Sequence, residues 1–281
     1  MVEIQIPTPE NKLCASLFEP REIRGLIVVA SATGVRRGFY QKFASYLCDH
    51  GFAVITFDYT GIGGSLSQPI RKITKGAEDW GRTDLNAVLQ YGMDRYPTST
   101  KLVMGHSIGG QIIGLAPRVV DYDGIVLMAA QSGYWKHWTG LGRVKMWFNW
   151  HVLFPTLLRT FGYLPSKRLT GMEDLPVNVA KQWSTWGKHS EYLLGHLPTE
   201  KTYYQKISKP ISSFMVEDDD LGPQSASDWL LDQYSLADRN RILLRPEDLG
   251  LKGIGHFGLF KEKHKEVLWP LVLDEIEERF L

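Results

Sequence analysis

The feature that most constrains this chain is a Gly-x-Ser-x-Gly pentapeptide, Gly105-His106-Ser107-Ile108-Gly109, which directly follows a short apolar run. Residues 101–104 have the composition of a buried strand, and residues 111–115 have helical character. A serine between such a strand and helix lies on a tight, strained turn, so the residues two before and two after it must lack bulky side chains. Gly105 and Gly109 meet that demand. The context predicts a nucleophilic Ser107 at the edge of a sheet, rather than an idle serine in a glycine-rich turn.

The rest of the chain alternates apolar strand patterns with helical ones, which predicts an α/β fold with a mostly parallel sheet and helices on both faces. The closing helix is expected at about 262–280, with Pro270 as a candidate bend. The expected strands are Val2–Ile6, Lys12–Phe18, Leu26–Ala30, Phe52–Phe57, Lys101–Met104, Gly124–Ala129, Pro210–Val216 and Ile242–Leu244.

The segment 133–204 breaks this alternation, because it contains no convincing buried strand. Six of the nine tryptophans fall there, and apolar residues recur at roughly helical spacing. We interpret it as a helical cap inserted into a core formed by residues 1–132 and 205–281. Most of its aromatics are expected to form the segment's own core. A few would face Ser107 as a substrate pocket, and the candidates are Trp135, Trp138 and Trp147.

Composition limits the classes of partner. A formal net charge of +1 gives no reason to expect nucleic acid as a partner. No apolar run reaches membrane-spanning length, so no stable membrane insertion is expected. The first residues lack the pattern of a secretory signal, and Cys14 and Cys48 are expected to be free thiols. A cytoplasmic protein is therefore expected, and the oligomeric state is left open.

A serine hydroxyl is a weak nucleophile near neutral pH, so Ser107 implies a histidine base and an acid that orients it. In proteins with such a turn, the order along the chain is serine, acid, histidine, and the last two follow later strands. His256 satisfies this order, in a glycine-flanked loop between the last expected strand and the closing helix. The seven other histidines precede the turn, lie within it or lie in the 133–204 segment, except His264, which is placed on the charged face of the closing helix.

The acid is expected in the run Glu217-Asp218-Asp219-Asp220, which follows a predicted strand. Four adjacent carboxylates repel one another, so most must be solvated and only one turns toward His256. The run lacks the alternate ligand spacing of a calcium loop, and the chain has no double-histidine zinc motif, so no metal is expected. The glycines at 61, 63 and 64 match neither a dinucleotide fingerprint nor a phosphate-binding loop, so no cofactor is expected.

With these pieces in order, the chain resembles an α/β-hydrolase over nearly its whole length. The matching pieces are residues 105–110, the glycine-rich turn 58–65, the Asp-x-x-x-Pro loop 219–223 and Gly255-His256-Phe257-Gly258. In that family the acid precedes a proline by four positions, which selects Asp219 over Asp218 and Asp220. The chain also resembles a bacterial group of predicted serine hydrolases related to lysophospholipase-like and serine-aminopeptidase-like enzymes, which shares residues 30–34 and the pair Trp80-Gly81.

The resemblance implies an α/β-hydrolase fold and two main-chain groups that hold the developing oxyanion. Many relatives carry His-Gly after the third strand, whereas this chain reads Ala30-Ser31-Ala32-Thr33-Gly34. The donors are therefore assigned to Ile108 N–H and to the N–H of either Ala32 or Thr33.

These inferences lead to an expected function. The chain is expected to hydrolyse esters of small or lipophilic acyl groups by a Ser107–His256–Asp219 triad, through an acyl-enzyme. Aminopeptidase or amidase, thioesterase and acyltransferase chemistry remain open on the same triad. So does a non-catalytic binding protein that retains the fold.

Overall fold

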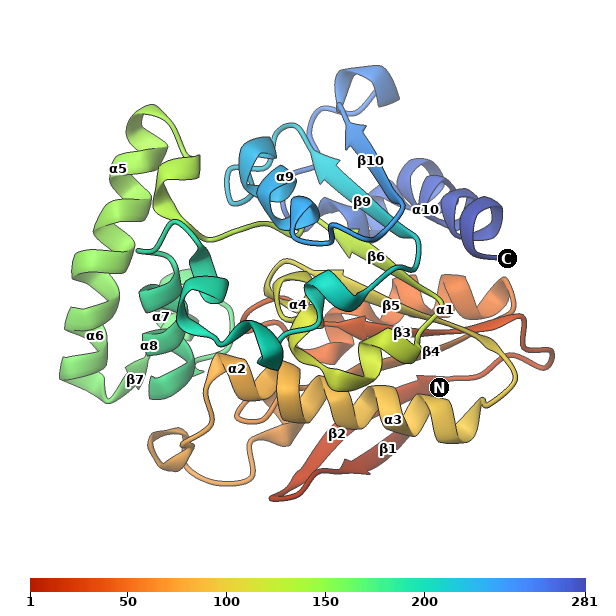
Figure 1. Ribbon diagram of the computed structural model, residues 1–281, viewed down its shortest axis with the longest axis horizontal. Helices are drawn as coiled ribbons and strands as arrows, with labels where there is room; N and C mark the ends of the chain where they lie inside the picture. Colours follow the sequence, from red (N-terminus) through yellow and green to blue (C-terminus); the bar gives the residue numbers. More distant parts are fainter.

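A computed structural model describes all 281 residues, and an eight-stranded sheet lies at its centre (Figure 1). Its last six strands in spatial order are parallel to one another, and the first two form an antiparallel hairpin at one edge. In spatial order the strands are β1 (Val2–Pro7), β2 (Lys12–Phe18), β4 (Phe52–Phe57), β3 (Gly25–Ala30), β5 (Thr100–His106), β6 (Gly124–Met128), β9 (Ile211–Val216) and β10 (Arg239–Leu244).

Helices cover both faces of this sheet, because side chains along each central strand alternate between two apolar cores. In β3, Val28 packs into one core while Ile27 and Val29 pack into the other. The first core also holds side chains of α3 (Asn86–Arg95) and α9 (Gln224–Asp232). The second holds side chains of α1 (Gln41–Asp49) and α10 (Lys265–Phe280). The predicted fold class, a mostly parallel sheet with helices on both faces, is confirmed.

Two helical regions are short or irregular. The helix after Ser107, α4, is only Ile108–Gln111, and a short 3₁₀ turn at Ile113–Leu115 follows it. The three-residue α2 (Ala77–Asp79) runs through a π-helical turn into α3.

His264 was predicted on the charged face of the closing helix, and this is wrong. It lies in a 3₁₀ turn directly before α10, where its ring is buried and neither ring nitrogen has a hydrogen-bond partner. Burial, with Lys263 and Lys261 nearby, lowers the pKa of this imidazole.

The segment 133–204 is mainly helical and lies to one side of the sheet (left in Figure 1). It contains a two-stranded antiparallel pair, β7 (Tyr163–Leu164) and β8 (Leu175–Pro176), which the sequence pattern missed because each strand is only two residues long. Its helices are α5 (Gly140–Phe148), α6 (Phe154–Phe161), α7 (Ser166–Thr170) and α8 (Val177–Trp186), and a π-helical turn joins α5 to α6.

No helix of the structure combines the length and the apolar character that crossing a membrane requires. Both cysteines are free thiols; Cys14 is buried and Cys48 is half-buried.

Candidate active site

Ser107 lies on the turn between β5 and α4, and its backbone has the strained conformation that the sequence predicts. Its φ of 54° is in the left-handed region, which costs a residue with a side chain about 1–3 kcal/mol. A Cβ on Gly105 would lie 2.4 Å from the Gly110 Cα, and one on Gly109 would lie 2.1 Å from the Ala30 carbonyl oxygen. Glycine is therefore required at both positions, because the turn brings backbone segments into contact.

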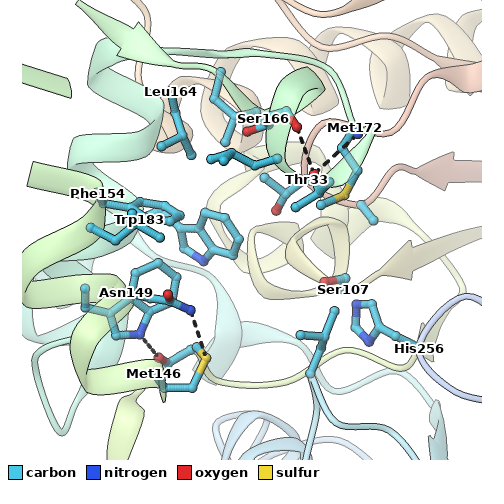
Figure 2. A pocket seen from close by; sticks show the side chains of 18 of the residues that line it. Thr33, Ser107, Met146, Asn149, Phe154, Leu164, Ser166, Met172, Trp183 and His256 are labelled. Atoms are coloured by element: carbon cyan, nitrogen blue, oxygen red, sulfur yellow. Dashed lines mark hydrogen bonds between the residues drawn. The ribbon is translucent and has the colours of Figure 1, made fainter. Parts of the chain in front are cut away.

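His256 lies on the loop that follows β10, and it is paired with the predicted acid. Its Nδ1 is 2.7 Å from Oδ2 of Asp219, and both side chains are almost fully buried. His256 and Ser107 line one cavity, where Figure 2 shows the His256 ring next to Ser107. No hydrogen bond joins the Ser107 hydroxyl to this ring in the structure, and such contacts are often loose before substrate binds.

The structure separates the carboxylates of the acidic run by environment. Asp219 is buried, and its second oxygen, Oδ1, accepts the N–H of Leu221 at 2.8 Å. A Cβ on Gly222 would lie 2.8 Å from Asp219 Oδ2, so a side chain at this position would collide with the carboxylate. Asp220 is exposed and uses only its carbonyl oxygen, which accepts the indole N–H of Trp138 at 2.8 Å.

Asp218 holds the loop that carries His256. Its Oδ2 accepts the N–H of Ile254 at 2.9 Å, and its Oδ1 accepts the N–H of Gly255 at 3.0 Å. Gly255 has a φ of 63°, so the loop turns sharply just before the histidine. These adjacent carboxylates thus contact two parts of the same loop. Asp219 contacts the His256 ring, and Asp218 contacts the backbone just before His256.

His106 connects three loops of the site, a role that sequence reasoning did not assign to it. The Ala32 N–H donates to the Tyr40 hydroxyl at 2.8 Å, and that hydroxyl lies 2.9 Å from His106 Nδ1. His106 Nε2 lies 3.0 Å from the His256 carbonyl oxygen. All three contacts are satisfied when Tyr40 donates to Nδ1 and Nε2–H donates to the carbonyl. Burial, and to a lesser extent the neighbouring His256, lowers the pKa of His106 well below its usual value. The ring therefore stays neutral.

This chain of contacts bears on the choice between Ala32 and Thr33 as a candidate oxyanion donor. The Ala32 N–H is already bonded to Tyr40, so of the two alternatives only the Thr33 N–H remains without a protein acceptor. The Thr33 hydroxyl is also buried without a partner, and Thr33 lines the cavity. Ile108 is the first residue of α4, where backbone N–H groups have no acceptor within the helix.

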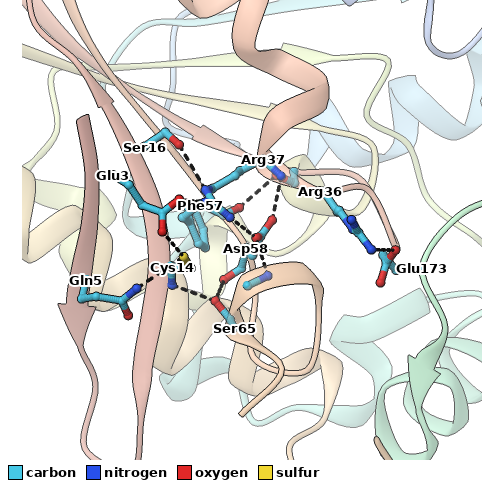
Figure 3. A network of polar contacts seen from close by, with 12 residues as sticks. Glu3, Gln5, Cys14, Ser16, Arg36, Arg37, Phe57, Asp58, Ser65 and Glu173 are labelled. Carbon is cyan, nitrogen blue, oxygen red and sulfur yellow. Dashed lines mark hydrogen bonds and ion pairs between the residues drawn. The ribbon is translucent and has the colours of Figure 1, made fainter. Parts of the chain in front are cut away.

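The loop that follows β3 is held from the opposite side by a buried ion pair (Figure 3). Asp58 is fully buried and accepts the backbone N–H of Arg37 at 2.7 Å and its guanidinium at 2.6 Å. Asp58 Oδ2 also accepts the N–H of Gly64 at 2.9 Å, and a Cβ on Gly63 would lie 2.6 Å from that oxygen. Gly63 and Gly64 therefore allow the backbone of this turn to lie directly against the Asp58 carboxylate.

The cavity that contains Ser107 and His256 has a volume of about 330 Å³, and most of its wall is apolar. Figure 2 shows Phe154, Leu164 and Trp183 on the side opposite Ser107 and His256. Of the predicted pocket tryptophans, Trp138 lines the cavity, whereas Trp135 and Trp147 lie outside its lining. Trp150 and Trp183 line it instead, because the inward face of the helical run 140–161 and the facing helix α8 carry them.

Glu173 is the one acidic residue in the cavity lining, and two cations pair with it. Its Oε1 lies 2.5 Å from the Arg36 guanidinium and 3.2 Å from the Lys167 ammonium. Nowhere in the structure are three or more histidine, cysteine, aspartate or glutamate side chains arranged to hold a metal ion.

Comparison with known proteins places the chain in one family. Residues 21–181 match the family model described as serine aminopeptidase, S33. No curated protein matches the chain in sequence.

Solved structures share the fold at low sequence identity. A soluble variant of monoglyceride lipase from Saccharomyces cerevisiae, bound to a substrate analog, is 13% identical with a TM-score of 0.73, over 100% of this chain and 97% of the other. Est1E from Butyrivibrio proteoclasticus is 16% identical with a TM-score of 0.63, over 99% of each chain. A monoacylglycerol lipase from Paleococcus ferrophilus is 14% identical with a TM-score of 0.61, over 95% of this chain and 99% of the other.

Proposed function

The chain belongs to the serine aminopeptidase S33 family of α/β-hydrolases, and on that premise we propose that it hydrolyses carboxylic esters through an acyl-enzyme on Ser107. One observation carries the proposal. A serine in a strained strand-to-helix turn shares a mostly apolar cavity with His256, whose other side is hydrogen-bonded to Asp219. This set of groups contains a nucleophile, a base and an orienting acid in one site.

The proposed reaction has two steps. The Ser107 oxygen attacks the ester carbonyl carbon while His256 takes the hydroxyl proton, and the resulting oxyanion collapses as His256 returns that proton to the departing alcohol. A water molecule then attacks the acyl-enzyme, again giving a proton to His256, and the carboxylic acid leaves as Ser107 regains its proton. Asp219 holds the imidazole tautomer with Nδ1 protonated and stabilises the imidazolium formed in each step.

We assign the oxyanion site to the backbone N–H groups of Ile108 and Thr33. Both residues adjoin Ser107 or line its cavity, and the Thr33 N–H has no acceptor within the protein. Removing one such donor typically costs about 3–4 kcal/mol of transition-state stabilisation. His106 is a positioning residue in this scheme, because its contacts connect the Thr33 loop, through Ala32 and Tyr40, to the backbone of His256.

We assign residues 133–204 to the cap of this site, since they supply most of the apolar wall opposite Ser107. The pairing of Glu173 favours an ester over an amine-bearing peptide. An aminopeptidase needs a carboxylate free to bind the substrate ammonium, whereas Glu173 already contacts both Arg36 and Lys167. Asp174 accepts the backbone N–H of Lys167, and Glu191 lies outside the cavity lining.

Replacing Ser107 with alanine tests the nucleophile. We expect Ser107→Ala to lower kcat on p-nitrophenyl esters by on the order of 10⁶-fold, because without the oxygen no acyl-enzyme forms. Covalent labelling by a fluorophosphonate probe should disappear in the same variant.

Ser213→Ala is the matched control. Ser213 is buried in β9, its hydroxyl has no hydrogen-bond partner, and it is not part of the cavity lining. This variant should be labelled and should turn over esters like the wild type. Labelling of Ser107→Ala at the wild-type rate would contradict the assignment, and a folded wild type that resists the probe would favour a binding protein.

A further inference from the structure

The helical run 140–161 carries a second apolar face, which points away from the cavity. Its inward residues, such as Met146 and Trp150, are buried beside the cavity. On the outside, Leu141 is 88%, Val144 61%, Phe148 46% and Val152 37% exposed. These four recur at intervals of three and four residues, so they form one stripe along the helix. Exposed apolar side chains are ordinary when they are scattered, but a contiguous stripe indicates an interaction surface.

The segment that carries this stripe has charges of a single sign, and the exposed Asp220 of the core lies near the Leu141 end of the stripe. Residues 133–172 include Lys136, Arg143, Lys145, Arg159, Lys167 and Arg168 but no aspartate or glutamate. All six cations are exposed, and only Lys167 pairs with an acid, Glu173. The chain's net charge of +1 conceals this local excess, because acidic residues elsewhere offset it. Such a face is complementary to a negatively charged surface.

The cavity opens beside the same face. Among its lining residues, Lys145 of α5, with Leu169 and Thr170 of α7, are exposed to solvent. Lys145 follows Val144 of the stripe directly, so the mouth of the cavity and the stripe share one helix. Trp147, which is 42% exposed and stacked on His151 at 5.0 Å, lies beside the stripe. Exposed tryptophans of this kind are favoured where an apolar phase meets water.

We propose that the outward face of residues 140–161 docks on the headgroup layer of a bilayer containing anionic lipids. The apolar stripe would lie among the upper acyl carbons while the surrounding lysines and arginines contact lipid phosphates. A second copy of the chain fits less well, because a two-fold interface would place this cationic face against itself. The cavity mouth at Lys145 then faces the lipid, which is the source of an apolar ester substrate.

Vesicle sedimentation of the full chain tests this docking without depending on hydrolysis. We expect binding to vesicles of phosphatidylcholine mixed with phosphatidylglycerol, little binding to phosphatidylcholine alone, and weaker binding at high salt. The double variant Val144→Gln, Phe148→Gln should lower the partition coefficient by roughly tenfold or more. Lys136→Gln with Arg159→Gln should lower it by a similar factor, since each cation near an anionic surface contributes about fivefold.

Leu236→Gln provides the matched control, because Leu236 is 62% exposed in the loop between α9 and β10, outside the cap. It should bind vesicles like the wild type, and every variant should retain turnover of a water-soluble ester, which shows that it is folded. Equal sedimentation of the wild type and the Val144/Phe148 variant would overturn the proposal. So would a solution dimer that this variant dissociates. Either result leaves the ester hydrolysis proposal standing.

Discussion

At the scale of single residues, Asp84 shows how a buried carboxyl can support the site from outside it. It lies in the π-helical turn before α3 and accepts the Thr60 N–H at 2.7 Å and the Thr60 hydroxyl at 3.0 Å. The Thr60 carbonyl in turn accepts the indole N–H of Trp80 at 3.1 Å. Asp84 thus holds the turn that follows β4. Burial outweighs these hydrogen bonds and raises the pKa of Asp84 to about 7.

This raised pKa predicts that stability falls as the pH rises through the range below 7. An aspartate carboxyl in the unfolded chain has its ordinary pKa of 3.8, so between that value and about 7 the folded chain retains a proton that the unfolded chain has lost. The free energy of unfolding should therefore decrease with pH across this window. Asp84→Asn removes the titration, so its unfolding free energy, measured by urea denaturation, should fall less between mildly acidic and mildly basic pH.

Asp94→Asn is the control, because Asp94 is an exposed carboxylate on α3. It should retain the pH dependence of the wild type. Parallel pH profiles for the wild type and Asp84→Asn would show that Asp84 has no raised pKa in the folded state.

At the scale of elements, the loops after β9 and β10 form one unit. Asp218 accepts two backbone N–H groups of the second loop, and Asp219 accepts the ring N–H of His256 from the same loop. The site therefore depends on the register of β9 against β10, in which Val216 pairs with Leu244 at the ends of the two strands. A shift of either strand would separate the Asp219 carboxylate from the His256 ring.

We expect Asp218→Asn to loosen this unit while Asp219 stays in place. An amide can accept only one of the two N–H groups and turns a donor toward the other. The loss should be about 1 kcal/mol of stability, which lowers the melting temperature by roughly 2 °C. Because the base is then less well positioned, kcat should fall about tenfold with little change in KM.

Asp220→Asn offers a neighbouring comparison, since the Asp220 side chain is exposed and makes no hydrogen bond. It should behave like the wild type in both measurements. Identical kcat and melting temperature for the two asparagine variants would argue against the Asp218 contacts.

The elements also show what local sequence could reveal. The central strands were predictable because buried parallel strands are continuous apolar runs, and β4 was predicted with its observed ends. The sharp turns at Ser107 and just before His256 were predictable because glycines at fixed offsets mark them. The strands β7 and β8, by contrast, are too short for any periodicity. The burial of His264 depends on how the turn before α10 packs, which local charge does not reveal.

At the scale of the whole molecule, the cavity lies between the core and the 133–204 segment, which supplies most of its lining residues. The sequence indicated that such a segment exists, but its lining residues depend on how α5, α6 and α8 pack together. Trp147 and Trp150 are three residues apart, yet one is exposed and the other lines the cavity. The role of His106 likewise requires contacts with residues 66 and 150 positions away.

The size of the cavity predicts a preference for acyl groups of intermediate length. A volume of about 330 Å³ is near the lower end for ligand sites, which typically span roughly 300–1,000 Å³. On a series of p-nitrophenyl esters, kcat/KM should rise about fourfold per added methylene while the chain still fits, then fall for long chains.

Aminoacyl p-nitroanilides should be poor substrates because Glu173 is already paired.

Two adjacent positions provide the control for this series. Leu153 lines the cavity, so Leu153→Phe should move the optimum to shorter acyl groups. Val152 is exposed and does not line the cavity, so Val152→Phe should leave the optimum unchanged. Equal turnover of every chain length would contradict an acyl group bound in this cavity.

The imidazole rings of His106 and His256 have centres 5.2 Å apart, and the proposed reaction requires them in different protonation states. Burial lowers the pKa of His106 and keeps its ring neutral, so in the proposed mechanism it does not compete for the Ser107 proton. A second cationic ring at that separation would repel the imidazolium of His256 just when the reaction needs it. Because His106 is fully buried and stays neutral, His256 is the imidazole left to accept the proton in the proposed reaction.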